Sequence, residues 1–351
     1  MIKIVINLFL CFKLYSDSLY TTDYKQEINL LEALDIESSF LYDKRMNTIF
    51  SKNRTEYQDD FLYSIDKAYI YIPAIKNILA KNNVPKEFVY LAMVESHFSS
   101  LTISNKEAVG IWQFIPETAK DYHLRMDKYV DERQDIVKST QAAVNFLKAL
   151  YKKFGKWYLV VIAYNCGAGR LEKAINSAGS NDLTILLDDR KHYIPRESRR
   201  YIRKLVAYIL MGNDYFFLLK REYEHFFNIS NTYSLSTVKL PVGESLSRVS
   251  KIIGLPLNKL KDLNRHLKYE FTPPYLMNYD IYIPYEKLTT FKREYFQKSS
   301  YCKYEIYNVQ KDDTLKKISE LYNISYVKLV IFNKLSNSKI FENQQLIIPI
   351  K

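Results

Sequence analysis

The most informative part of the hydrophobic pattern lies at residues 84–96. Apolar residues recur there at helical steps of four and three, at Val84, Phe88 and Leu91, which predicts a helix with one face in a core. The next step along this face falls on Glu95. A carboxylate is costly to bury, and burial raises its pKa toward the range in which a general acid works near neutral pH. From spacing alone, the alternative is a carboxylate at a helix end that simply reaches water.

The residues after Glu95 form an ordered series of motifs. Ser96 follows directly, Gly110–Gln113 has the form Gly-x-x-Gln, and Ala163–Asn165 reads Ala-Tyr-Asn. This order resembles the lysozyme-like catalytic domain of the soluble and membrane-bound lytic murein transglycosylases, in particular the membrane-bound D type. The resemblance runs from about residue 71 to residue 208 and implies an all-helical, lysozyme-like fold.

The resemblance implies that Glu95 is the catalytic acid. Cleavage of a glycosidic bond requires protonation of the leaving oxygen while positive charge develops on the sugar ring, and most glycosidases use two carboxylates for this. Only Glu95 has a compelling position, because Glu107, Asp131 and Glu132 lie in polar stretches and are expected to face solvent. In the family, the substrate's own N-acetyl group assists. The same Glu then acts as base on the 6-hydroxyl of the muramic acid, which leaves a 1,6-anhydro end.

The family's motifs also imply a set of substrate-binding residues. These are Ser96, Gln113, Tyr164, Asn165 and Tyr201. Gln113 can both donate and accept, so it could bridge the acid and a sugar acetamide, with a buried structural amide as the alternative. For Tyr164 and Asn165, the alternative to substrate binding is a purely structural role at a corner of the chain. Tyr201 is expected on the site floor and lies four residues after Glu197, on one helical face.

Several neighbouring residues leave structural alternatives open. Trp112 and Phe114 offer either sugar-stacking faces or core packing. Three of the chain's 8 glycines lie in or beside these motifs and are expected at tight turns or close backbone approaches: Gly110, Gly167 and Gly169. Cys166 replaces the family's usual Ala, but none of the 5 histidines has a spacing that indicates a thiol nucleophile.

The last third of the chain contains an internal repeat. Five positions recur at an offset of 69 residues: Leu240, Leu246, Val249, Leu260 and Asn264 return as Val309, Leu315, Ile318, Leu329 and Asn333. Each unit ends in an apolar strand closed by proline and is expected to fold as strand, helix, helix, strand. The second unit resembles a LysM domain, with Asp312 where that family usually has Gly, and the first is a degenerate version of it. LysM modules bind N-acetylglucosamine-containing glycans. The resemblance therefore implies glycan contacts at Asp313, Thr314 and Asn333, and the alternative is a small structural domain that no longer binds.

Composition and charge agree with a folded, multidomain chain. A chain of 351 residues is longer than one ordinary hydrophobic core can organise, so more than one domain is expected. Its content of 47% hydrophobic residues excludes a disordered chain. The net charge of +12 favours an anionic partner such as murein peptide stems, although a solvated basic surface is the plain alternative. No nucleic-acid-binding motif and no metal-ligand cluster is visible, and no cofactor is expected.

The N-terminus predicts export. An apolar run from Ile4 to Phe12, broken only by Asn7, suits a short signal peptide better than a membrane span. Cleavage around residues 16–18 is the simpler expectation, and lipidation at Cys11, with membrane anchoring, is the alternative.

These features predict a mainly α protein of the bacterial cell envelope (periplasm). Its expected parts are a signal peptide or lipoprotein signal (1–18), an N-terminal helical extension (19–65), a lysozyme-like transglycosylase domain (66–222), a degenerate LysM-like module (230–290) and a LysM module (303–351). Both modules are expected to be small α+β (βααβ) units. The predicted activity is lytic cleavage of the MurNAc-GlcNAc β-1,4 bond in peptidoglycan glycan strands. The alternatives are a hydrolytic muramidase, which needs a second carboxylate or a held water, and a catalytically weak peptidoglycan-binding scaffold.

Overall fold

The computed structural model describes residues 25–43, 45–46, 54–68, 70–99, 103–104, 107–223, 235–295, 303–333, 335 and 339–350. The signal-peptide and lipidation predictions fall on residues 1–18 and lie outside this set. The chain divides into two compact units, one of residues 1–124 and 136–232 and one of residues 125–135 and 233–351. Among the described residues, every helix is too short or too polar to span a membrane.

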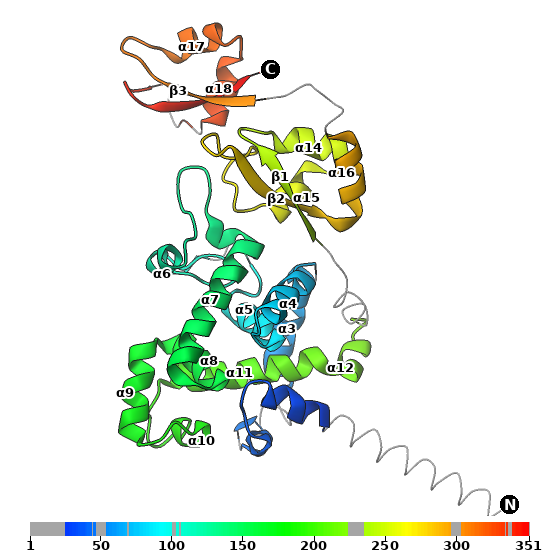
Figure 1. Ribbon diagram of the computed structural model, residues 1–351, viewed down its shortest axis with the longest axis vertical. Helices are drawn as coiled ribbons and strands as arrows, with labels where there is room; N and C mark the ends of the chain where they lie inside the picture. Colours follow the sequence, from blue (N-terminus) through cyan, green and yellow to red (C-terminus); the bar gives the residue numbers. More distant parts are fainter. Residues whose placement is uncertain are drawn as a thin grey trace, which may run out of the picture. The chain divides into compact units, whose positions relative to one another are not determined.

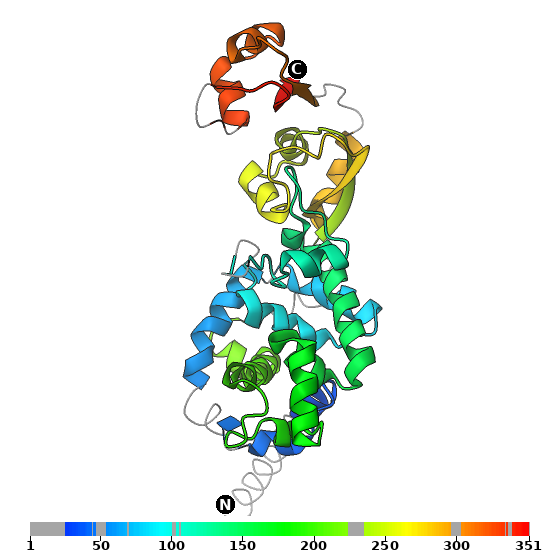
Figure 2. The same ribbon diagram turned by 90° about the vertical axis from the view of Figure 1, so that its left-hand side faces the viewer.

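The described part of the first unit contains helices and no β-strand, which confirms the predicted fold class. Its helices include η1 (Ser38–Tyr42), α3 (Arg54–Ala68), α4 (Ile72–Lys81), η2 (Lys86–Phe88), α5 (Val89–Ser96), α6 (Pro116–Asp121), α7 (Ile136–Phe154), α8 (Trp157–Cys166), α9 (Ala168–Ala178), α10 (Leu183–Leu186), α11 (Arg196–Asn213) and α12 (Tyr215–Leu219). Figure 1 shows α11 running across this unit from α8 to α12, and Figure 2 shows it end-on with other helices around it. The central helix α11 packs against α3, α5, α8 and α12.

The predicted apolar face at residues 84–96 is confirmed. Val84, Phe88 and Leu91 are 2%, 0% and 0% exposed, and α5 packs against α11. The helix ends directly after Ser96, because His97 and the following residue adopt φ values of 49° and 54°, in the left-handed region. This reversal leaves Glu95 in the last turn of α5, beside the central helix.

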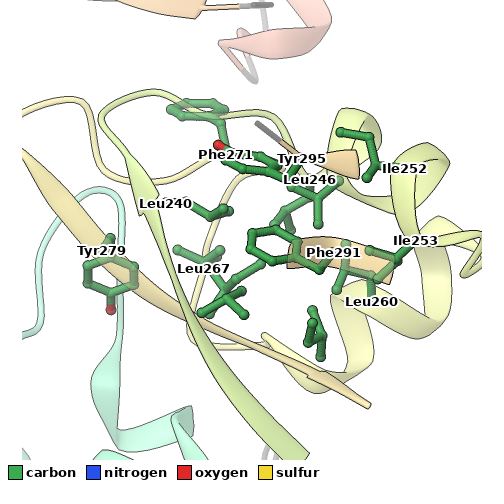
Figure 3. Packing of buried hydrophobic residues seen from close by; sticks show 14 of the residues in the cluster. Leu240, Leu246, Ile252, Ile253, Leu260, Leu267, Phe271, Tyr279, Phe291 and Tyr295 are labelled. Carbon is green, nitrogen blue, oxygen red and sulfur yellow. The ribbon is translucent and has the colours of Figure 1, made fainter. Parts of the chain in front are cut away.

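The second unit contains two modules of the same design, which confirms the predicted βααβ order. The first consists of β1 (Leu235–Pro241), α14 (Leu246–Ile253), α15 (Leu257–Leu263) and β2 (Asn278–Pro284), followed by η4 (Tyr285–Lys287) and α16 (Leu288–Glu294). The second consists of β3 (Lys303–Asn308), α17 (Leu315–Leu321), α18 (Tyr326–Phe332) and β4 (Gln345–Ile350). In each, the two strands pair antiparallel as a sheet of their own. Figure 3 shows how apolar side chains from both strands and the helices of the first module meet in its core.

The repeated asparagine makes the same pair of hydrogen bonds in both modules. The Asn264 amide donates to the Tyr282 carbonyl (2.8 Å) and accepts from the Tyr282 N–H (2.7 Å). Asn333 makes the same two bonds with the backbone of Ile347 (3.0 and 2.6 Å). The side chain thereby ties the end of the second helix to the last strand, which explains why this polar residue recurs among apolar ones.

The second unit also contains a segment from the middle of the chain, residues 125–135, which includes η3 (Glu132–Gln134). Asp131 and Glu132 are 7% and 5% exposed, so the expectation that they face solvent is wrong. Glu107 is exposed as expected. The difference arises because residues distant in sequence cover the segment, which a polar local pattern cannot reveal.

Candidate functional site

Glu95 is partly buried and held by a tyrosine from the central helix. The Tyr201 hydroxyl, on α11, donates a hydrogen bond of 2.5 Å to Glu95 Oε1. Burial raises the pKa of Glu95 to about 7, the Tyr201 hydrogen bond acts in the opposite direction, and the negative charge of Glu197 adds to the rise. A carboxyl group with this pKa populates both its acid and its base form near neutral pH, as a group that first donates and then accepts a proton requires.

Tyr164, on α8, lies beside the same carboxyl group. Its hydroxyl donates to the Trp112 carbonyl (2.5 Å). Burial and the charge of Glu95 raise the pKa of the Tyr164 and Tyr201 phenols well above the usual value. Both phenols therefore stay protonated and act as hydrogen-bond donors beside Glu95. The structure thus brings together three of the predicted site residues, from α5, α8 and α11.

The predicted Gly-x-x-Gln motif forms a tight turn. Gly110 and Gln113 adopt φ values of 83° and 49°, and Gln113 donates to the Gly110 carbonyl through both its N–H (3.2 Å) and its side-chain amide (2.8 Å). A left-handed conformation is uncommon for a residue with a Cβ and is often found where function demands a particular geometry. The expected turn at Gly110 is confirmed, whereas a bridge from Gln113 to a sugar stays a prediction.

Ser96 and Trp112 connect this turn to the helical core. Ser96, 3% exposed, donates to the carbonyls of Ala92 and Ile111, both at 3.0 Å. Trp112 is fully buried and donates from its indole nitrogen to Thr140 (3.0 Å). Core packing is therefore the role of Trp112, as it is of Phe114, which is 2% exposed. Ser96 ties α5 to the turn, and its predicted contact with substrate is untested.

Asn165 links α8 to α11, since its Oδ1 accepts a hydrogen bond of 2.6 Å from Ser198. The chain then turns at Gly167, where φ is 88°. The expectation of a turn or close approach at Gly169 is wrong, because this residue lies inside α9 without a positive φ, and a Cβ there would meet nothing within 4 Å. Burial raises the pKa of the Cys166 thiol, which disfavours the thiolate that a cysteine nucleophile needs.

A groove runs beside the Glu95–Tyr201 pair. Its lining residues are Tyr57, Val94, Arg196, Glu197, Arg200, Tyr201 and Lys204. Three of them are cations at successive steps of four along α11, so one face of this helix presents a positive rim to the groove. The position of Glu197 beside Glu95 was not predicted from the sequence. Its spacing of four residues from Tyr201 could have indicated this position, because that spacing puts both side chains on one face of the helix.

The predicted glycan-binding residues of the second LysM module maintain its fold. Asp313 accepts from the Tyr307 hydroxyl and the Gln310 N–H, both at 2.7 Å, and Thr314 caps α17 by accepting from the Lys317 N–H at 3.2 Å. Asp312 has a φ of 68°, which explains why the LysM family usually has Gly at this position. Contact of Asp313, Thr314 or Asn333 with a glycan stays a prediction.

Metal ligation finds no support in the part of the chain that the structure describes. There, no three His, Cys, Asp or Glu side chains gather as a metal site.

Family comparisons agree with the domain order. Residues 73–186 match the Transglycosylase SLT domain, residues 234–299 match the LysM-like domain of lytic transglycosylase MltD, and residues 307–349 match the LysM domain. Membrane-bound lytic murein transglycosylase D from Escherichia coli K12 is 30% identical over 299 residues, which are 80% of this chain. The match spans 64% of the length of that relative.

Two solved structures have similar regions. One is the 70 kDa soluble lytic transglycosylase from Escherichia coli, with 22% identity and a TM-score of 0.34 over 41% of this chain and 24% of that chain. The other is an inactive mutant of lytic transglycosylase Slt from Pseudomonas aeruginosa, with 16% identity and a TM-score of 0.33 over 42% of this chain and 24% of that chain. The chain therefore contains a transglycosylase SLT domain followed by two LysM-type domains, and it is similar to membrane-bound lytic murein transglycosylase D.

Proposed function

We propose that this protein is a peptidoglycan lytic transglycosylase of the cell envelope that cleaves the MurNAc-GlcNAc β-1,4 bond and leaves a 1,6-anhydromuramic acid end. One observation carries the proposal: Glu95 has a pKa of about 7 and is oriented by the Tyr201 hydroxyl in an SLT-type domain. A carboxyl group at its ordinary pKa would be ionised near neutral pH and would rarely hold the proton that the leaving oxygen needs.

The chemistry needs only one carboxyl group. In its acid form, Glu95 gives its proton to the glycosidic oxygen, the bond from that oxygen to C1 of the muramic acid breaks, and the acetamide oxygen of the same sugar bonds to C1. Glu95, now a carboxylate, then removes the proton of the 6-hydroxyl as O6 replaces the acetamide oxygen on C1. No water is consumed, and Glu95 ends protonated for the next cycle.

The hydrogen bond from Tyr201 supports both halves of this cycle. It occupies Oε1 of Glu95, so the other carboxyl oxygen, Oε2, is the one that exchanges the proton with substrate. The bond also lowers the pKa that burial raises, which keeps the base form accessible. The cationic rim of Arg196, Arg200 and Lys204 is suited to the carboxylates of peptide stems that the muramic acid carries.

The decisive experiment is mass spectrometry of purified murein digested with the wild type and with Glu95→Gln. Gln keeps the shape of the side chain and its ability to accept from Tyr201, but it cannot transfer the proton. We expect anhydro-ended fragments from the wild type, and a rate lower by about two to four orders of magnitude in the variant. Binding of both proteins to sacculi is the control for folding and for the LysM-type modules.

Other outcomes identify the alternatives. Fragments heavier by one water, with reducing ends, indicate a muramidase, for which Glu197 is then the carboxylate to replace. Binding by both proteins without any fragments indicates a scaffold. Near-full activity of Glu95→Gln refutes the mechanism.

A further inference from the structure

The segment 125–135 carries buried charged groups that the site around Glu95 does not use. Asp131, Glu132, Arg133 and Asp135 are 7%, 5%, 9% and 0% exposed. A buried carboxylate loses its hydration and is tolerated only where other groups replace the lost water. Asp131 forms an ion pair of 2.8 Å with Arg133 in its own segment. Glu132 Oε2 accepts from the Arg125 N–H of the same segment at 2.9 Å. The other oxygen of Glu132, and Asp135, are bound by side chains of the first LysM-like module.

Two tyrosines of β2 bind these carboxylates. The Tyr279 hydroxyl donates to Glu132 Oε1 at 3.0 Å, and the Tyr282 hydroxyl donates to Asp135 Oδ1 at 2.7 Å. Burial and the neighbouring carboxylates raise the pKa of both phenols above the usual value, so both stay protonated donors. In Figure 3, Tyr279 lies at one side of the core cluster, and its hydroxyl points away from the other labelled residues. His266, fully buried, places its Nδ1 3.7 Å from the other oxygen of Asp135.

The backbone of the segment also pairs with the module. The Asp131 N–H donates to the His266 carbonyl, and the Lys268 N–H donates to the Tyr129 carbonyl, both at 2.9 Å. Val130 pairs antiparallel with Leu267 and is fully buried. The Tyr129 side chain joins the module's core cluster and packs against three aromatic rings, those of Tyr269, Phe271 and Tyr275.

The second module of the repeat provides an internal comparison. Asn264 and Asn333 make the same bonds to Tyr282 and Ile347, which aligns the two modules residue by residue. In this alignment, His266, Tyr279 and Tyr282 correspond to Leu335, Gln344 and Ile347. The second module therefore keeps the fold of the repeat but has none of the three side chains that face the buried carboxylates. These side chains are dispensable for the βααβ fold itself.

We propose that the first LysM-like module is an intramolecular receptor whose bound partner is the chain's own segment 125–135. His266, Tyr279 and Tyr282 recognise the two carboxylates, and the residues around Leu267 add the backbone pairing. The segment lies between α6 and α7, inside the residues that match the SLT domain, whereas the module begins about a hundred residues later in the chain. The module thus holds a loop of the catalytic domain, and the face that does so is not a glycan-binding face.

Hydrogen–deuterium exchange of the full-length protein, followed by mass spectrometry, tests this proposal. In the wild type, we expect peptides covering residues 125–135 to be protected, because the Asp131 N–H is bonded to the module. In the Tyr279→Phe/Tyr282→Phe double variant, both rings remain but the two hydroxyl donors are lost, and we expect protection of this segment to fall by about tenfold or more. Peptides from α5 should exchange as in the wild type. Tyr285→Phe is the matched control, since this tyrosine directly follows β2 and is 52% exposed.

The proposal is overturned if, in the wild type, residues 125–135 exchange at the rate of an unstructured peptide while β1 and β2 are protected. Unchanged protection in the folded double variant also overturns it. If the double variant does not fold, Asp135→Asn is measured in its place and is expected to lower the protection of the same segment. The wild-type result by itself still decides whether the module binds the segment. Neither readout depends on enzyme activity, so failure here leaves the proposed catalytic function standing.

Discussion

Replacement of Tyr201 by Phe isolates the hydrogen bond that tunes Glu95. The substitution removes one oxygen atom, and the ring keeps its packing, since Tyr201 is 9% exposed. The 2.5 Å bond from this hydroxyl stabilises the ionised form of Glu95 and lowers its pKa. Without the bond, burial and the charge of Glu197 act unopposed, so the pKa of Glu95 must rise above its value of about 7.

The size of the rise follows from the strength of the bond. Hydrogen bonds to charged groups contribute about 1.5 to 3 kcal/mol, and the lower end applies here because Glu95 is only partly buried and water can replace part of the loss. One pKa unit corresponds to about 1.4 kcal/mol, so the pKa should rise by about one unit. A general acid works only while protonated, so activity is lost as pH rises through this pKa. The alkaline limb of the profile should therefore move to higher pH.

The assay is the pH dependence of kcat/KM on soluble glycan fragments, measured for the wild type and for Tyr201→Phe. The maximal rate should also fall, because the carboxyl group loses the donor that orients it. Tyr208→Phe is the matched control: Tyr208 is fully buried two turns further along α11, and its loss of a hydroxyl should leave the alkaline limb in place. An alkaline limb that stays fixed or moves to lower pH in Tyr201→Phe refutes the assignment of this limb to Glu95.

Three further predictions concern the same groups and the repeat. Burial is the main cause of the raised pKa of Glu95, and Glu197→Gln removes the negative charge that adds to it, so the alkaline limb should move to lower pH, opposite to Tyr201→Phe. Glu95→Gln should stabilise the fold: the pKa is about 7 in the native state against 4.5 ordinarily, so the wild type loses stability as pH rises through this window. Thermal unfolding should show a gain of about 3 kcal/mol at about pH 8, from about 1.4 kcal/mol for each unit of pKa difference, and none below about pH 4. Asn264→Ala should cost about 2 to 4 kcal/mol in chemical denaturation, because it leaves the backbone groups of Tyr282 buried without partners, and equal stability would contradict this role.

Much of the fold could be predicted because its signals are local. The steps of four and three that place Phe88 and Leu91 in the core depend only on helical geometry, and the recurrence of Asn264 as Asn333 revealed both modules. The Gly110 turn was also predictable, since its backbone requires a positive φ. Local pattern failed at Asp131 and Glu132, whose polar neighbours indicated exposure although residues of the first module bury them.

The sequence by itself determined the helical domain, the two βααβ modules and the identity of Glu95 as the residue out of place on an apolar face. Only the tertiary structure decided what surrounds that carboxyl group. The Tyr201 hydroxyl that binds Glu95 is 106 residues away, and the tyrosines that bind Glu132 and Asp135 are each 147 residues away from them. Periodicity follows from the geometry of one helix or strand, whereas burial, pKa and docking depend on which distant surfaces the fold brings into contact.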